Sequence, residues 1–143
     1  MNNNARNIDI LEHIVKYCDE IFETIKYFGN SFETFKSNSI YRNAISMCVL
    51  QIGELTGHLS DSFKEMYNEV PWKNIKGMRN FMAHKYGDIS ISTVWEAIAE
   101  DVPELRNYCN SILEKHNVLE ESALMENEEN SEPENEENEI ELE

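Results

Sequence analysis

The sequence lacks the cysteine and histidine patterns of disulfide-bonded and zinc-binding proteins. Its three cysteines, Cys18, Cys48 and Cys109, are odd in number and far apart, and no C-x-x-C pair occurs. The four histidines form no cluster with the spacing of metal ligands. Because each cysteine stands among apolar residues at helical spacing, we expect three small buried side chains, a reduced cytoplasmic compartment and no metal site.

Long apolar runs are missing as well. Runs such as Met47-Cys48-Val49-Leu50 are much shorter than the roughly 20 residues that a membrane-spanning helix requires. The start, Met1-Asn2-Asn3-Asn4, has no apolar region of the kind found in secretory signals. We therefore expect a protein that is neither secreted nor inserted in a membrane.

The period of a β-strand does not occur over a convincing length, whereas apolar residues recur at three and four positions in four stretches. These stretches predict helices from Ile8 to Phe28, from Tyr41 to Leu59, from Pro71 to just before Gly87, and from Thr93 to Ile112. The connections between them are short. The predicted fold is an all-α antiparallel helical bundle without internal repeats.

Residues at the ends of these stretches support the boundaries. Gly29-Asn30 is a stop signal for the first helix, and Asn38 or Ser39 is placed to cap the second. Thr93 opens the last helix with a capping box. Pro103 lies inside that helix, so we expect a kink or a break there.

Charge divides the chain into two parts. Residues 120–143 contain 12 of the 28 acids and no lysine or arginine, so the rest of the chain carries only about −4 of the net charge of −16. We predict a helical domain over residues 1–118 and a disordered, Glu-rich tail over 119–143. Such a tail is either a solvated extension or a segment that folds over a basic surface and competes with an anionic ligand.

The basic surface lies in the stretch 70–87, which contains no acid. Lys73, Lys76 and Lys85 fall within it and are the predicted contacts to RNA phosphates. The stretch also contains Arg79 and His84, together with Asn80 and Tyr86. It is therefore the place where we expect the chemistry of this protein.

The spacing of Arg79 and His84 limits how they can act together. Five positions correspond to about 140° around a straight helix, so the two side chains do not face each other within one copy, whereas Asn80 and His84 share a face. Either the helix ends near His84, or arginine and histidine converge when two chains meet across a two-fold axis. A shared site in a homodimer satisfies both residues.

These residue types suit the cleavage of a phosphodiester. Histidine can accept a proton from a ribose 2′-OH or donate one to the leaving oxygen, and arginine can hold the phosphate. Asn80 can orient the imidazole or the phosphate. The stretch offers no carboxylate cluster for magnesium, so the predicted chemistry is metal-independent, which favours RNA over DNA because DNA lacks the internal nucleophile. Alternatively, His84 is stabilised by the helix dipole, Arg79 forms an ordinary salt bridge, and Tyr86 packs.

At these residues the sequence resembles the HepT-like branch of the HEPN domains, whose R-x4-H-x-Y motif is matched by Arg79, His84 and Tyr86. The resemblance covers about residues 7–116. Further runs also resemble this family in order and approximate spacing: Gln51-Ile52-Gly53-Glu54-Leu55, Val70-Pro71-Trp72, Gly77-Met78-Arg79-Asn80, Val94-Trp95 and Val102-Pro103-Glu104-Leu105.

The resemblance implies a homodimeric toxin of a type VII toxin–antitoxin pair that acts as a metal-independent endoribonuclease. Arg79 and His84 of both protomers, with Asn80 beside them, would line one cleft. It also implies a partner, a minimal nucleotidyltransferase antitoxin of the MntA type, which moves AMP from ATP onto Tyr86 and so blocks the cleft. ATP is then the partner's substrate, and this chain itself needs no cofactor. The Glu-rich extension departs from the family pattern.

Two other functions stay open from the residues alone. The chain could be a non-catalytic HEPN protein that serves as a binding partner or modification substrate of a nucleotidyltransferase, and the acidic tail favours this by repelling RNA. It could also be a purely structural helical bundle. The intact motif favours the ribonuclease, and the acid-free stretch 70–87 argues against the structural role.

Overall fold

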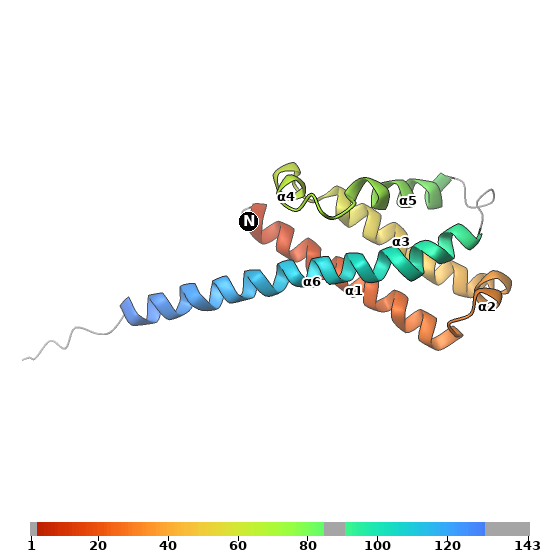
Figure 1. Ribbon diagram of the computed structural model, residues 1–143, viewed down its shortest axis with the longest axis horizontal. Coiled ribbons are helices and arrows are strands. Elements are labelled where there is room, and N and C mark those ends of the chain that lie inside the picture. The colour runs from red at the N-terminus through yellow and green to blue at the C-terminus, as the bar shows by residue number, and fades with distance from the viewer. Residues whose placement is uncertain (1–2, 85–90, 131–143) are drawn as a thin grey trace, which may run out of the picture. The chain divides into compact units, whose positions relative to one another are not determined.

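The structure is a computed structural model that describes residues 3–84 and 91–130 (Figure 1). Over these ranges the chain is helical and contains no strand, which confirms the predicted all-α fold. The described helices are α1 (Asn3–Phe28), α2 (Phe32–Ser37), α3 (Ser39–Gly57), α4 (Asp61–Met66), α5 (Trp72–His84) and α6 (Ile91–Asn130).

Two of the predicted helix ends are made by the expected residues. Gly29 has φ of 110°, a left-handed conformation that favours glycine, and its N–H donates to the carbonyl of Ile25 over 2.8 Å. Asn38 caps α3, because its Oδ1 accepts from the backbone N–H groups of Ile40 and Tyr41 at 3.0 and 3.1 Å. Both signals predicted from the sequence are confirmed.

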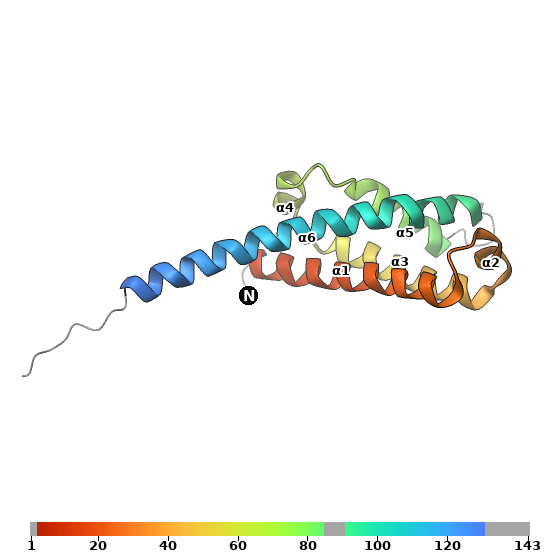
Figure 2. The ribbon, with the colours of Figure 1, turned by 60° about the horizontal axis from the view of Figure 1, so that its bottom comes forward.

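The chain divides into two compact units, Met1–Leu113 and Glu114–Glu143. In the first unit α1 and α3 lie side by side and run in opposite directions, and α5 packs along the other side of α3 (Figures 1 and 2). Residues 91–113 of α6 complete the bundle. The four long helices of this unit, α1, α3, α5 and residues 91–113 of α6, alternate in direction, as the prediction of an antiparallel bundle requires.

Buried aliphatic and aromatic side chains from all of these helices form one core. Tyr41 of α3 stacks on Phe28 and meets Phe35 edge to face, with ring centroids 4.8 and 5.1 Å apart. Trp95 of α6 lies 5.1 Å from the Phe35 ring. Burial of Tyr41 raises the pKa of its hydroxyl, which donates to the carbonyl of Gly29 over 3.1 Å. The aromatic cluster therefore joins the turn after α1 to α3 and α6.

Two polar pairs fix the helices at other points. Asn7 is buried, its Nδ2 donates to Ser60 Oγ over 3.0 Å, and its Oδ1 accepts from the Ser60 N–H at 3.2 Å. This reciprocal pair ties the start of α1 to the N-cap of α4. Between the last helix and the first, Arg106 Nε of α6 donates to Asp19 Oδ1 of α1 over 2.5 Å. The two pairs therefore add directed contacts between helices to the apolar packing of the core.

The last helix differs from the prediction in three ways. It begins at Ile91 instead of Thr93, passes through Pro103 without a break, and continues to Asn130. The helix thus includes residues 119–130 of the predicted Glu-rich tail, where glutamate, leucine, alanine and methionine favour a helix although every side chain is exposed. Residues 131–143 of the predicted tail, and the expected stop at Gly87, lie outside the described residues.

No helix in the described part of the chain combines the length and the apolar character needed to cross a bilayer.

Candidate functional site

Arg79 lies where α5 comes closest to α3. A methyl group built on Gly53 of α3 would overlap the Cβ and Cγ atoms of Arg79 and lie 3.5 Å from its Cα. The aliphatic stem of the arginine therefore occupies the space that a side chain at position 53 would need. Glycine at this point permits the close approach of the two helices.

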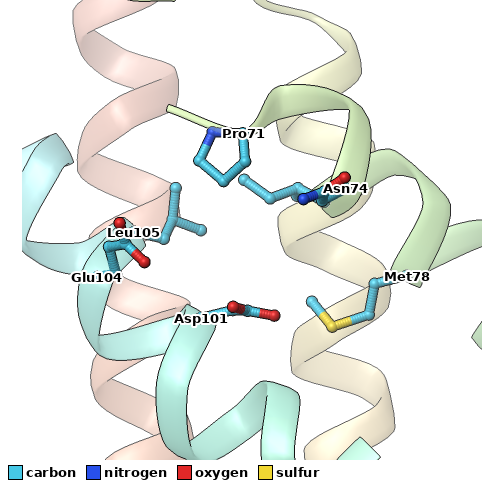
Figure 3. A pocket seen from close by; sticks show the side chains of 7 residues that line it. Pro71, Asn74, Met78, Asp101, Glu104 and Leu105 are labelled. Atoms are coloured by element: carbon cyan, nitrogen blue, oxygen red, sulfur yellow. The ribbon is translucent and has the colours of Figure 1, made fainter. Parts of the chain in front are cut away.

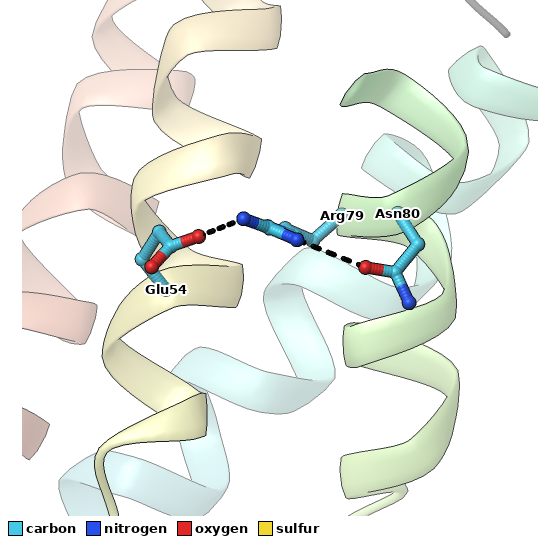
Figure 4. A network of polar contacts seen from close by, with 3 residues as sticks. All are labelled: Glu54, Arg79 and Asn80. Atoms are coloured by element: carbon cyan, nitrogen blue, oxygen red, sulfur yellow. Dashed lines mark hydrogen bonds and ion pairs between the residues drawn. The ribbon is translucent and has the colours of Figure 1, made fainter. Parts of the chain in front are cut away.

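The guanidinium of Arg79 is held between two polar partners (Figure 4). Its Nη2 forms an ion pair with Glu54 Oε1 on α3, and its Nη1 donates to Asn80 Oδ1 over 3.0 Å. The arginine side chain is 35% exposed and that of Glu54 is 51% exposed, so the pair is reachable from solvent. Because a guanidinium has five N–H donors, these two contacts orient it and leave donors for an anion.

A small hollow lies on the other side of α5, between this helix and α6 (Figure 3). It is lined by Asn74 and Met78 of α5 and by Asp101 and Glu104 of α6, among others. Its volume of about 20 Å³ is enough for roughly one water molecule. The hollow is too small for a nucleotide, and its acids disfavour a phosphate.

The three cysteines take no part in this site. All three thiols are buried, as expected, and unpaired. Burial raises the pKa of Cys18 to about 12, with a further contribution from the neighbouring Cys109, whose own pKa is raised to about 12 by burial. Burial and the Glu20 carboxylate raise the pKa of Cys48 to about 11. Protonated, buried thiols are inert as nucleophiles.

Within residues 3–84 and 91–130 no three histidine, cysteine or acidic side chains are grouped so that they could hold a metal ion.

The comparison with protein families identifies the chain. The ribonuclease HepT-like family matches residues 9–112, which include α5 and its contact with α3. The chain belongs to the ribonuclease HepT-like family.

Relatives of this HepT-like chain carry ribonuclease names. A "putative RNase" of Caldanaerobacter subterraneus subsp. tengcongensis is 36% identical over 105 residues, which cover 73% of this chain and 92% of that protein. A "putative RNase" of Methanocaldococcus jannaschii is 30% identical, covering 67% of this chain and 86% of the relative. A "probable ribonuclease HepT" of Thermococcus cleftensis is 29% identical, covering 68% and 87%. The search of solved structures found no match.

The structure brings some of the predicted site residues of the HepT-like chain together. Arg79 and Asn80 are in direct contact, and Asn80 orients the guanidinium, whereas its predicted role toward the imidazole or the phosphate stays a prediction. Lys73 and Lys76 are exposed on α5. His84 is the last residue of α5, but its side chain lies outside the described residues.

Lys85 and Tyr86, the other two predicted site residues, also lie outside the described part of the chain. Their predicted roles as a phosphate contact and an AMP acceptor stay predictions.

Glu54 is the residue that sequence reasoning missed. It was part of the run that resembles the family, yet no role followed from its position 25 residues before Arg79. One signal was available: Gly53 is a glycine inside a helical stretch, which often marks a close approach of another segment. A polar residue next to such a glycine, as Glu54 is, is well placed to contact a side chain of the helix that packs across it.

Proposed function

We propose that this HepT-like chain is an endoribonuclease that cleaves RNA with Arg79, His84 and Asn80. The observation that carries the proposal is the oriented, half-exposed guanidinium of Arg79 within a chain of the ribonuclease HepT-like family. The ribonuclease names of its relatives support the same class of activity. RNA is the proposed substrate, and DNA is not.

In the proposed reaction the imidazole of His84 accepts the proton of a ribose 2′-OH, and the resulting oxygen attacks the neighbouring phosphorus. The bond to the 5′-oxygen breaks, and that oxygen receives a proton from a second imidazole. The products are a 2′,3′-cyclic phosphate and a 5′-OH end. Arg79 neutralises the charge that develops on the phosphate, and no metal is required.

We further propose that two copies of the chain form the complete site. His84 follows Arg79 by five positions on α5, about 140° around a straight helix, so one helix does not aim both side chains at one phosphate. In a two-fold dimer the arginine of one protomer and the histidine of the other can meet. Two imidazoles in one cleft also provide the base and the acid that the reaction needs.

The resemblance to type VII toxins supports a regulatory proposal for Tyr86. A minimal nucleotidyltransferase would transfer AMP from ATP to the tyrosine hydroxyl, with release of pyrophosphate. The added phosphate would lie next to the cations of the stretch 70–87 and fill the space that RNA needs. The chain would then be the toxin of a cytoplasmic toxin–antitoxin pair, and ATP would be used by the partner alone.

The proposed activity is tested by incubating the purified protein with mixed cellular RNA in EDTA, beside the His84→Ala variant. We expect the wild type to cut and leave 2′,3′-cyclic phosphate ends, and the variant to be inactive but folded with an unchanged molecular mass. Cleavage by both proteins would indicate a contaminating nuclease. Cleavage that needs added magnesium would contradict the metal-independent reaction.

If neither protein cuts, the mass of Tyr86 distinguishes two explanations. An AMP adduct on the purified wild type, absent from Tyr86→Phe, indicates a neutralised ribonuclease, and we expect the Phe variant to cut RNA. An unmodified Tyr86 in an inactive protein would replace the proposal by a non-catalytic HEPN protein that binds a nucleotidyltransferase.

A further inference from the structure

Gly77 lies in the interior of α5, at a position where no contact within the described chain requires a glycine. It is exposed, and a methyl group built on it would meet no atom within 4 Å. Its backbone is not left-handed, since Gly29 is the one positive-φ glycine among the described residues. Alanine would therefore fit, and it favours a helix interior more than glycine does.

Gly53 differs from Gly77, because at Gly53 the aliphatic stem of Arg79 occupies the space that a side chain would need. At Gly77 the corresponding space is open to solvent. A glycine that keeps the surface of a helix bare lets another molecule approach the backbone closely. The identity of that molecule follows from the side chains around the glycine.

The side chains around Gly77 are cationic or amide. Lys73 is one turn before it, Lys76 is adjacent, and Asn80 is nearly one turn after it, and all three are exposed. Together with Gly77 these three residues form a row along one face of α5, and the row extends about 10 Å along the helix axis. Among the ion pairs of the described residues, none involves Lys73 or Lys76.

Three acids that contact or adjoin α5 lie on other sides of this helix. Glu54 is engaged by Arg79 (Figure 4), and Asp101 and Glu104 of α6 line the hollow beside Asn74 and Met78 (Figure 3). No acid occurs in the sequence from Val70 to Asn80. The row is thus a cationic face in a chain whose net charge is −16.

We propose that Lys73, Lys76, Gly77 and Asn80 form a seat for the sugar-phosphate backbone of the RNA. This inference rests on the proposed ribonuclease function and extends its substrate surface to the first half of α5. The two ammonium groups neutralise phosphates, Asn80 donates from its amide nitrogen, and Gly77 lets the RNA backbone contact the helix. A dimer contact centred on Lys73 and Lys76 would set lysines against lysines, so we assign this first half of α5 to RNA and not to the contact of the proposed homodimer.

The test compares Gly77→Ala and Gly77→Leu with the control Gly57→Ala, whose added methyl group also meets no atom within 4 Å. Each change is made in the His84→Ala background, and binding of a fluorescent single-stranded RNA is followed by anisotropy. We expect Gly77→Ala to raise the melting temperature by about 4 °C. The same variant should weaken RNA binding at least fivefold, and Gly77→Leu more, while Gly57→Ala binds as the parent does.

Two lysine variants examine the charge of the seat. Lys73→Gln and Lys76→Gln should each reduce the slope of log affinity against log salt concentration by about one, as the loss of one phosphate contact requires. Unchanged RNA binding by both Gly77 variants would overturn the seat. A change of molecular mass in solution would overturn it as well, since the face would then be a protein interface.

The test of the RNA seat can fail or succeed independently of the test of RNA cleavage. Binding is measured in a protein that cannot cut, so Gly77-dependent binding supports the seat even if the wild type has no activity. Conversely, wild-type cleavage that is insensitive to the Gly77 changes would keep the ribonuclease and remove the seat.

Discussion

Arg79 combines a packed stem with an accessible head. The stem replaces a side chain at Gly53, and the head is shared by Glu54 and Asn80. An arginine fixed in this way loses little further entropy when it binds a phosphate, because its rotamer is already selected. The Glu54 carboxylate that fixes the arginine is also an anion beside the proposed RNA site. It should therefore raise kcat by positioning Arg79 and weaken RNA binding by repelling the phosphates.

This opposition gives a prediction for Glu54. We expect Glu54→Ala to lower kcat for RNA cleavage on the order of tenfold or more, because the guanidinium is no longer aimed. The KM for RNA should stay the same or fall, because a negative charge has been removed from the site. Single-turnover and steady-state kinetics on a short RNA separate the two effects.

Glu54→Gln is the matched variant, since it keeps an oxygen that can accept from Arg79 Nη2 but loses the charge. It should recover part of kcat. The melting temperature of both variants should change little because the pair is half exposed. A rise in kcat for Glu54→Ala would show that the carboxylate inhibits the arginine instead of positioning it.

The sequence predicts residues of this site that are close along the chain and misses the partner that is distant. Arg79 and Asn80 are adjacent, so their contact needs only the local helix. Glu54 meets Arg79 because α3 and α5 cross at Gly53, and a crossing point depends on the packing of whole helices. No period or spacing within either segment specifies it.

At the scale of elements, the crossing of α3 and α5 depends on one missing side chain. We expect Gly53→Ala to lower the free energy of unfolding by about 1–3 kcal/mol, because the methyl group forces the helices apart. The better helix propensity of alanine, worth about 1 kcal/mol, offsets part of this loss. Urea denaturation measures the difference.

Gly57→Ala on the same helix provides the control, since its methyl group points into open space. It should leave the free energy of unfolding unchanged or raise it slightly. Equal stabilities of the two variants would contradict the tight crossing.

Helix length decides which elements the sequence predicts. The amphipathic period is clear in α1 and α3, which have 26 and 19 residues. The six-residue helices α2 and α4 are too short to display a period, and they were not predicted. Pro103 does not break α6 because it removes a single donor, while the flanking Val102 and Leu105 are buried in the core.

At the scale of the whole molecule, the buried thiols make stability depend on pH. Burial raises the pKa of Cys18 and Cys109 from 9.0 to about 12 and that of Cys48 to about 11. Above pH 9 the unfolded chain loses protons that the folded chain keeps. The stabilisation that comes from keeping these thiols protonated is therefore complete below pH 9 and is lost as the pH rises toward the folded pKa values.

We expect the free energy of unfolding to fall between pH 8 and 10 by about 1 kcal/mol for each buried thiol. Cys109→Ala has one such group fewer, so its stability should fall less over the same interval. The comparison cancels the lysine and tyrosine groups that titrate in both proteins. Parallel curves for the two proteins would mean that Cys109 ionises as easily in the folded state.

The uneven charge is a second property of the whole chain. Residues 120–143 hold 12 acids, all glutamate, and their removal changes the net charge from −16 to about −4. All described side chains from 117 to 130 are exposed, so no core is lost with them. Truncation after Leu119 should therefore leave the melting temperature within about 2 °C of that of the full chain.

The same truncation should strengthen RNA binding several-fold at 50 mM salt and have little effect at 300 mM, because salt screens the repulsion between the glutamates and the phosphates. A full-length variant with these twelve glutamates replaced by glutamine keeps the bulk of the segment and removes its charge. If charge is the cause, the glutamine variant binds RNA as the truncated protein does. If it binds as the wild type does while the truncated protein binds more tightly, the segment obstructs RNA by its volume, and the electrostatic explanation is wrong.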